Sequence, residues 1–256
     1  MNLENIKIRL SDVYKTFGSN AVLRGVNLDV GTRESVVIIG GSGSGKSVML
    51  KSILGLVMAD RGQILIDGQD LLHMNNSEID AARRKFGMLF QGGALFDSLP
   101  IWHNICFGLL QTKTIEMDQA EDIAIEKLRM VGLKPDVATR FPAELSGGMQ
   151  KRVALARAIA SQPEIIFFDE PTTGLDPIMA DVINGLIKDC VTELGATAVT
   201  ITHDMASVRK IADRVAMIYE GRILWNGAIA DLDHSGNEYV DQFIHGRAEG
   251  PIKMVA

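Results

Sequence analysis

The sequence has few cysteines, few aromatic residues and no excess of positive charge. Its 256 residues include only 2 cysteines, and aromatic residues make up 5%. This cysteine count excludes a disulfide-stapled miniprotein, and Cys106 and Cys190 each lie in an apolar stretch that favours reduced, buried thiols. Lysine and arginine number 26 against 32 acidic residues, a net charge of −6. We therefore expect no nucleic-acid partner, since such proteins favour a basic face.

No hydrophobic run is long enough to cross a bilayer. Apolar runs such as residues 36–39 and 165–168 fall far short of the roughly 20 residues that a membrane helix needs. The first residues alternate polar and apolar side chains and lack the apolar core of a signal peptide. We expect no direct membrane insertion, so any membrane role requires a partner. The composition, 46% apolar and 23% charged, is typical of a globular domain.

The order of expected strands and helices predicts an α/β fold. β-Type alternation covers residues 6–10 and 21–30 and predicts an N-terminal β-subdomain. Strands are expected at 35–39, 63–66, 165–168, 198–201 and 215–219, and helices at 46–56, 178–194 and 205–212, which together predict a mostly parallel sheet. From about 92 to 160 strand signals are nearly absent, and helices at 118–131 and 146–160 predict an inserted α-helical subdomain. We expect one domain over 1–246 and a C-terminal tail over 247–256.

A glycine-rich turn lies between a buried strand and a helix. It reads Gly40-Gly41-Ser42-Gly43-Ser44-Gly45-Lys46-Ser47 and fits the pattern G-x-x-x-x-G-K-[ST]. Glycines let backbone N–H groups converge on phosphate oxygens, and the helix N-terminus adds a favourable dipole. We expect Lys46 to reach the β- and γ-phosphates and the Ser47 hydroxyl to bind Mg²⁺. The alternative is a flexible loop that only caps the helix. Residues 40–47 are called the phosphate loop below.

A buried strand at 165–168 ends in two acids, Asp169 and Glu170, called the acid pair below. Charge at the end of a buried strand is costly unless it meets a cation. Asp169 is therefore expected to lie in the Mg²⁺ shell, and Glu170 to polarise the attacking water as general base. Taken alone, such a strand end is merely a solvated boundary.

A second helix N-terminus could receive phosphate. The signature segment, Leu145-Ser146-Gly147-Gly148-Met149, precedes a long helix, and Ser146 suits its N-cap. Gly147 and Gly148 leave backbone N–H groups accessible, although plain capping would explain the same residues. If this terminus lies far from the phosphate loop of its own chain, it could serve a neighbour's nucleotide, and a two-fold dimer would then hold two shared sites.

These segments, in this order, resemble the nucleotide-binding subunit of an ABC transporter, a P-loop NTPase. Gly174-Leu175-Asp176-Pro177 and Thr202-His203-Asp204 continue the resemblance, which covers nearly the whole chain. It implies ATP hydrolysis with Mg²⁺, and ATP sandwiched between the phosphate loop of one subunit and the signature segment of the other in a homodimer.

The resemblance also assigns roles to single residues. It implies that Phe17 stacks on adenine, with Tyr14 as the alternative. Gln91 would contact Mg²⁺ and the attacking water, and His203 would contact the γ-phosphate. Asp176 would communicate across the dimer. Each of these residues also has a purely structural interpretation, as strand packing, surface or turn residue.

The signature segment ends in Met149, where most ABC signatures end in Gln. That ending, with residues 90–96, Leu145–Arg152 and the tail at 241–251, resembles the Mla/Mce lipid-transport ATPases of double-membrane bacteria. The resemblance implies phospholipid movement between inner and outer membranes that maintains outer-membrane lipid asymmetry. It implies an integral-membrane permease, an Mce-domain substrate-binding protein and a STAS-domain subunit as partners, at the cytoplasmic face of the inner membrane.

Two segments have open interpretations. The apolar stretch from Gly92 to Leu110 is either core or a groove for a permease helix; the resemblance favours docking, with Phe96 and Trp102 as contributors. The C-terminal residues from 237 onward either fray or grip the partner ATPase subunit.

Other functions stay in contention. They are an importer ATPase for a small polar nutrient and a soluble, non-transport ABC ATPase. A P-loop kinase or GTPase would not need the signature segment.

Overall fold

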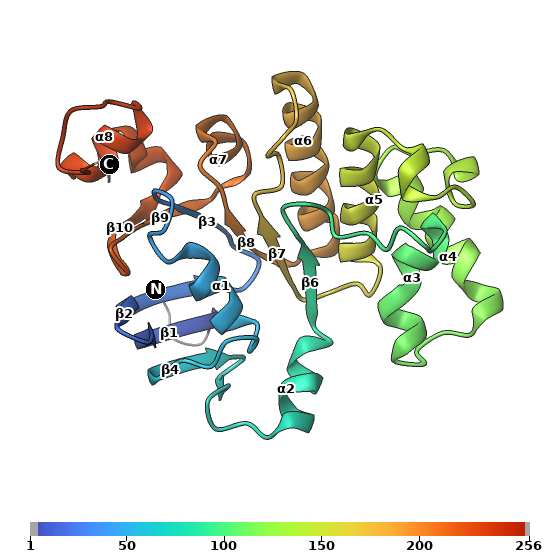
Figure 1. The fold of residues 1–256 in the computed structure, drawn as a ribbon, viewed down its shortest axis with the longest axis horizontal. Coiled ribbons are helices and arrows are strands. Elements are labelled where there is room, and N and C mark those ends of the chain that lie inside the picture. Colours follow the sequence, from blue (N-terminus) through green and yellow to red (C-terminus); the bar gives the residue numbers. More distant parts are fainter. Residues whose placement is uncertain (1–4, 254–256) are drawn as a thin grey trace. The chain divides into compact units, whose positions relative to one another are not determined.

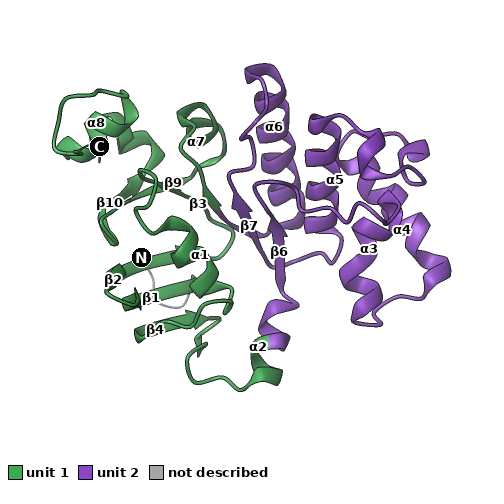
Figure 2. Ribbon diagram, in the orientation of Figure 1, with its two compact units in different colours: residues 1–79, 200–256 green, residues 80–199 purple. Residues whose placement is uncertain are grey.

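The computed structural model describes residues 5–253, which belong to two compact units (Figures 1 and 2). Unit 1 combines residues 1–79 with 200–256, and unit 2 comprises residues 80–199. The boundaries fall inside helix α2 (Asn76–Arg83) and strand β8 (Thr197–Ile201). The phosphate loop and His203 therefore share one unit, although more than 150 residues separate them in sequence.

Unit 1 contains an antiparallel sheet of four strands in the order β2-β1-β4-β5. The strands are β1 (Ile6–Phe17), β2 (Asn20–Gly31), β4 (Arg61–Ile66) and β5 (Gln69–Asp70). Ile8 and Leu10 of β1 are at most 2% exposed, as the alternation predicts. The register shifts between Leu10 and Val13, where Asp12 has a φ of 51°. This bulge breaks the alternation, which is why the sequence pattern indicated only the first part of the strand.

Three further strands of unit 1 are ordered β10-β9-β3. Strand β3 (Ser35–Ile39) runs parallel to β9 (Arg214–Tyr219), and β9 runs antiparallel to β10 (Arg222–Ala228). Glu220 and Gly221 join β9 to β10 with φ values of 46° and 74°, as in a type I′ hairpin turn. Strand β10 was not predicted, because its residues are exposed or half-buried and the strand has no apolar face.

The helices of unit 1 are short. They are α1 (Lys46–Ile53), α7 (Met205–Ile211) and α8 (Glu238–Ile244), with a 3-10 segment, η4 (Ile229–His234). Helix α1 ends before the expected residue 56 because Gly55 takes a φ of 67°, the left-handed conformation that terminates helices.

Unit 2 combines parallel strands with a helical subdomain. Its strand order is β8-β7-β6, and β6 (Phe86–Leu89) runs parallel to β7 (Ile165–Asp169). In the described part of the chain, no strand occurs in sequence between the end of β6 and the start of β7. The intervening helices are α3 (Ile101–Gln111), α4 (Met117–Met130) and α5 (Gly147–Ile159), with 3-10 segments η2 (Pro135–Val137) and η3 (Pro142–Glu144). Helix α6 (Pro177–Leu194) follows β7.

The helical subdomain packs through the face that the sequence predicts. Ala120, Ala124 and Leu128 of α4, together with Val131, are all 0% exposed. Helix α3 packs against α4 and α5. Helix α2 and strand β6 were not predicted, because α2 is strongly polar and β6 is only four residues long. Within residues 5–253, no helix combines the length and apolar character that a membrane crossing requires.

Candidate nucleotide site

The phosphate loop in unit 1 follows β3 and opens α1, as predicted. Gly45 caps α1 with a φ of 108° and no side-chain hydrogen bond, so the first N–H groups of α1 are not capped by a side chain. The Lys46 ammonium donates to the carbonyl oxygens of Gly40 at 2.7 Å and Gly41 at 2.9 Å. Lys46 thus curls over the loop, where its charge can meet phosphate oxygens.

The loop holds a polar atom that lacks a protein partner. The Ser44 hydroxyl is buried, and within residues 5–253 it makes no hydrogen bond. An unsatisfied buried hydroxyl costs about 1–3 kcal/mol, so an acceptor such as a phosphate oxygen would stabilise it. The exposed Ser47 hydroxyl lies at the start of α1. The residues of the loop therefore fit a bound phosphate chain.

His203 belongs to the same unit and follows the end of β8. The backbone N–H of Thr202 donates to the Ile38 oxygen at 3.3 Å, and the Asp204 N–H donates to the Thr202 hydroxyl at 3.0 Å. Because β3 leads directly into the phosphate loop, these bonds bring the exposed His203 to the strand end from which the loop departs.

Phe17 and Tyr14 differ in their surroundings. Phe17, at the end of β1, is 49% exposed, and the Lys15 ammonium lies 5.3 Å from its ring centroid. The Arg61 guanidinium covers the Tyr14 ring at 3.9 Å. One face of Tyr14 is thus already occupied, whereas Phe17 keeps exposed ring surface for a base.

Unit 2 brings the acid pair and Gln91 to one edge of its sheet. Leu89 of β6 pairs with Phe168 of β7 in parallel register. Because Gln91 and Glu170 each follow that pair by two residues, both leave the sheet at the same end. Glu170 has a φ of 49°, rare for a residue with a Cβ, and its carboxylate accepts a hydrogen bond from the Thr173 hydroxyl at 3.1 Å.

A buried lysine joins these residues. Lys151 of α5 is 8% exposed, and its ammonium donates to the backbone oxygen of Gln91. Burial lowers the pKa of Lys151, while the negative charges of Asp169 and Glu170 oppose that shift. Lys151 was not predicted as a site residue, and its one signal in the sequence is a lysine inside an alanine-rich helix.

The signature segment and Asp176 form a second group in unit 2. Ser146 caps α5 by accepting from the Met149 N–H at 3.4 Å. Asp176 caps α6 by accepting from the N–H groups of Ile178 and Met179, both at 3.0 Å. A Cβ on Gly148 would lie 2.6 Å from the Met179 Cε, so the Met179 side chain of α6 rests against the start of α5.

A family model described as "ABC transporter" matches residues 23–173, more than half of the chain. The chain belongs to this family. It is an ABC-type ATPase with the fold of its solved relatives. A structure described as the dimeric post-hydrolysis state of the ATP-binding cassette MJ0796, bound to ADP and Pi, shares 33% identity over 87% of this chain and 98% of that one, with a TM-score of 0.79.

Relatives of this ABC ATPase differ in name, and two of them differ in the substrate that the name gives. "Probable ribonucleotide transport ATP-binding protein mkl" of Mycobacterium leprae is 40% identical over 97% of this chain and 72% of that protein. "Intermembrane phospholipid transport system ATP-binding protein MlaF" of Haemophilus influenzae is 39% identical over 93% of this chain and 89% of that protein.

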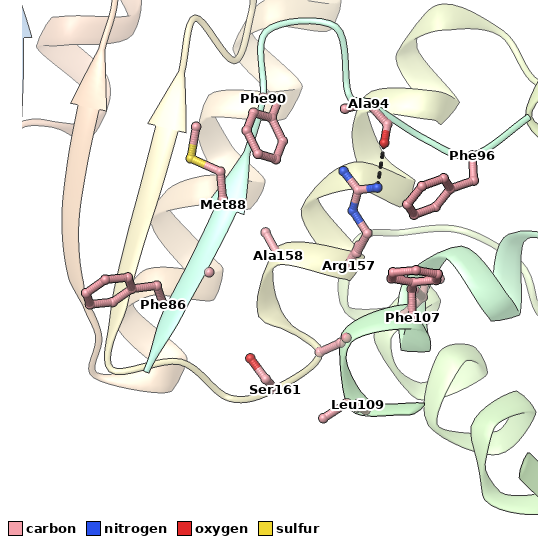
Figure 3. Close-up of a pocket in the computed structure, with 14 residues that line it drawn as sticks. Phe86, Met88, Phe90, Ala94, Phe96, Phe107, Leu109, Arg157, Ala158 and Ser161 are labelled. Carbon is pink, nitrogen blue, oxygen red and sulfur yellow. Dashed lines mark hydrogen bonds between the residues drawn. The ribbon is translucent and has the colours of Figure 1, made fainter. Parts of the chain in front are cut away.

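The ATPase also carries an aromatic groove in unit 2, with a volume of 470 Å³ (Figure 3). Phe86, Phe90, Phe96 and Phe107 line it, together with residues of α5. Phe96 is 42% exposed and lies 4.5 Å from Phe107 between ring centroids.

Trp102 of the expected docking stretch does not line the groove and stacks on His103 instead. Ile101 and Ile105 are at most 1% exposed, so part of the expected docking stretch is core.

Proposed function

We propose that this ABC ATPase drives a bacterial transporter that moves phospholipids between the inner and outer membranes and so maintains outer-membrane lipid asymmetry. The observation that carries the proposal is the 39% identity to the Haemophilus influenzae MlaF protein across 89% of that protein's length. The match extends well beyond the catalytic motifs, which all ABC ATPases share. Met149 at the end of the signature segment adds to the resemblance.

In the proposed site, ATP binds through Phe17, the phosphate loop and His203. The exposed Phe17 ring stacks on adenine. The backbone N–H groups of residues 40–45 and the Lys46 ammonium bind the β- and γ-phosphates, and His203 contacts the γ-phosphate. Ser47, Gln91 and Asp169 supply oxygen atoms only, the donor type that Mg²⁺ prefers. When bound, Mg²⁺ neutralises charge that develops on the phosphates.

Glu170 acts as general base in this proposal. Its left-handed backbone and its hydrogen bond from Thr173 fix the carboxylate at the sheet edge. There it accepts a proton from the attacking water, which the Gln91 side chain orients. Lys46 and His203 stabilise the charge on the departing phosphate.

Two copies of the chain form the working unit. The dimeric structures of the MJ0796 cassette support a homodimer. The nucleotide of the opposing subunit is then bound by Ser146, Gly147 and Gly148. Asp176 communicates between the two subunits across the dimer. ATP binding closes the dimer and hydrolysis reopens it, because the γ-phosphate no longer bridges the subunits.

The partners follow from the groove and from the lipid function. A cytoplasmic helix of an integral-membrane permease docks in the aromatic groove, within reach of residues 92–110. An Mce-domain substrate-binding protein and a STAS-domain subunit complete the complex. The ATPase is then a peripheral protein at the cytoplasmic face of the inner membrane, held by the permease.

Purification of the tagged full chain from detergent-solubilised membranes tests this proposal. Mass spectrometry should find a permease and an Mce-domain chain, with phospholipid enriched over an untagged control. Phe96→Ala should weaken permease recovery, whereas Trp102→Ala is the matched control outside the groove. Undiminished recovery with Phe96→Ala would refute docking in the groove.

Nucleotide or small-nutrient transport is the second candidate, because the Mycobacterium leprae relative is named for ribonucleotide transport. ATPase stimulation in the reconstituted complex separates the two. Phospholipid should raise the rate and ribonucleotides should not, and the reverse result would replace the lipid proposal.

A further inference from the structure

Two cations of helix α5, the buried Lys151 and the half-buried Arg157, hold the backbone of the glutamine loop, residues 90–96. Lys151 donates to the oxygen of Gln91, and Arg157 donates to the oxygens of Gly93 at 2.6 Å and Ala94 at 2.7 Å. Figure 3 shows the bond from Arg157 to Ala94 at the groove. Three carbonyl groups within four residues are thus bound by charged donors, the stronger class of hydrogen bond.

The backbone of the glutamine loop is constrained where it lies against α5. Gly93 and Ala94 both have positive φ, at 74° and 49°, and Ala94 is strained there because it carries a Cβ. A Cβ on Gly93 would lie 3.6 Å from the Cβ of Ala154, so the loop rests directly on the helix. The Gln91 side chain is exposed, while its backbone oxygen is bound.

Unlike Arg157, Lys151 also interacts with the acid pair. Its charge interacts with both Asp169 and Glu170, and these carboxylates offset part of the effect of burial on its pKa. Lys151 therefore links the glutamine loop to the acid pair through a direct hydrogen bond on one side and through electrostatics on the other.

We propose that Lys151 is a positioning residue for ATP hydrolysis, which fixes the backbone of Gln91 on helix α5 beside the acid pair. Arg157 fixes the carbonyl groups of Gly93 and Ala94 and so prevents the loop from shifting along the helix. Lys151 itself touches neither water nor phosphate in this role. It sets the direction in which the Gln91 side chain leaves the backbone.

The chain offers a matched control in Lys127 of α4. Lys127 is 4% exposed, and its ammonium contacts Glu126 at 2.8 Å and Met130 at 3.8 Å, not the glutamine loop. Lys127→Met removes a lysine of similar burial from the same unit. A purely structural role of Lys151 predicts that Lys151→Met and Lys127→Met behave alike.

ATPase kinetics of the purified full chain are the first test. Lys151→Met should lower kcat by about 10- to 100-fold, since small misplacements of catalytic groups have effects of this order. The KM for ATP should change little, because the phosphate loop is untouched. Lys151→Arg should retain most of the rate, since it keeps a charged donor. Lys127→Met should retain kcat even if its melting temperature falls.

Hydrogen exchange is the second test and does not depend on activity. Amides of residues 91–96 should exchange faster in Lys151→Met than in the native chain or in Lys127→Met. If Lys151→Met keeps its kcat, or if loop exchange is unchanged, the positioning role is wrong.

Discussion

Replacing Gly40 by alanine tests how tightly the phosphate loop is built. A Cβ at this position would lie 2.3 Å from the backbone oxygen of Ile218 in strand β9, and the φ of Gly40 is 155°. Strained backbone of this kind costs about 1–3 kcal/mol, and overpacking costs a further 1–3 kcal/mol or so. The free energy of unfolding should therefore fall by about 2–6 kcal/mol, which lowers Tm by roughly 5–20 °C for a chain of this length.

Gly41→Ala provides the control, because no atom lies within 4 Å of its Cβ position. Its Tm should stay within about 2 °C of the native value, as for most surface substitutions. Thermal unfolding and titration with a fluorescent ATP analogue measure both variants. Gly40→Ala should also bind the analogue more weakly, since movement of the loop displaces its N–H groups. Equal Tm values for the two variants would refute the reasoning.

Three other predictions follow from the site and the core. Glu170→Gln should lower kcat in a phosphate-release assay by about 10²- to 10⁴-fold, the usual contribution of a general base, while ATP binding persists; normal turnover would refute the assignment. Phe17→Ala should weaken ATP binding by roughly tenfold or more if it removes base stacking, whereas Tyr14→Ala should not; equal titrations would contradict the choice between them. Burial raises the pKa of Cys106 and Cys190 to about 11, so at pH 8 only about 0.1% of each thiol is the reactive thiolate. Mass spectrometry should show slow alkylation in the native chain and fast alkylation in denaturant, and rapid native labelling would contradict this burial.

The parts of the fold that sequence predicted are those with a strong local signal. Strand β3 reads as a continuous apolar run because residues Val36 to Ile39 are all 0% exposed. Ser146 was expected as an N-cap and caps α5. Strand β10 lacks such a signal because no face of it is fully buried. Strand β10 forms by pairing with β9 across the Glu220–Gly221 turn, and its own residues do not indicate that pairing.

From the residues alone, the expected site residues are those that form a contiguous motif, whereas the family resemblance supplies Phe17, Gln91 and His203. Lys46 and the acid pair are recognisable from neighbours in sequence. Lys151 is not, because Gln91 lies 60 residues earlier and meets it only after α5 packs beside the loop. In sequence, a lysine on an alanine-rich helix reads equally well as a surface residue whose stem covers apolar neighbours.

Burial of charge alone does not mark the functional lysine, because Lys127 and Lys151 are similarly buried. Lys151 donates to the glutamine loop, which contains the strained Ala94, whereas Lys127 contacts Glu126 and Met130. Ala94 and Glu170 both have φ values of 49°, which cost each about 1–2 kcal/mol. Each is fixed by a specific bond, from Arg157 to the Ala94 oxygen and from Thr173 to the Glu170 carboxylate. A chain selected for stability alone would relieve such strain with glycine. The strain at Ala94 and Glu170, in the two segments that Lys151 joins, is the physical reason to place the positioning role at the glutamine loop.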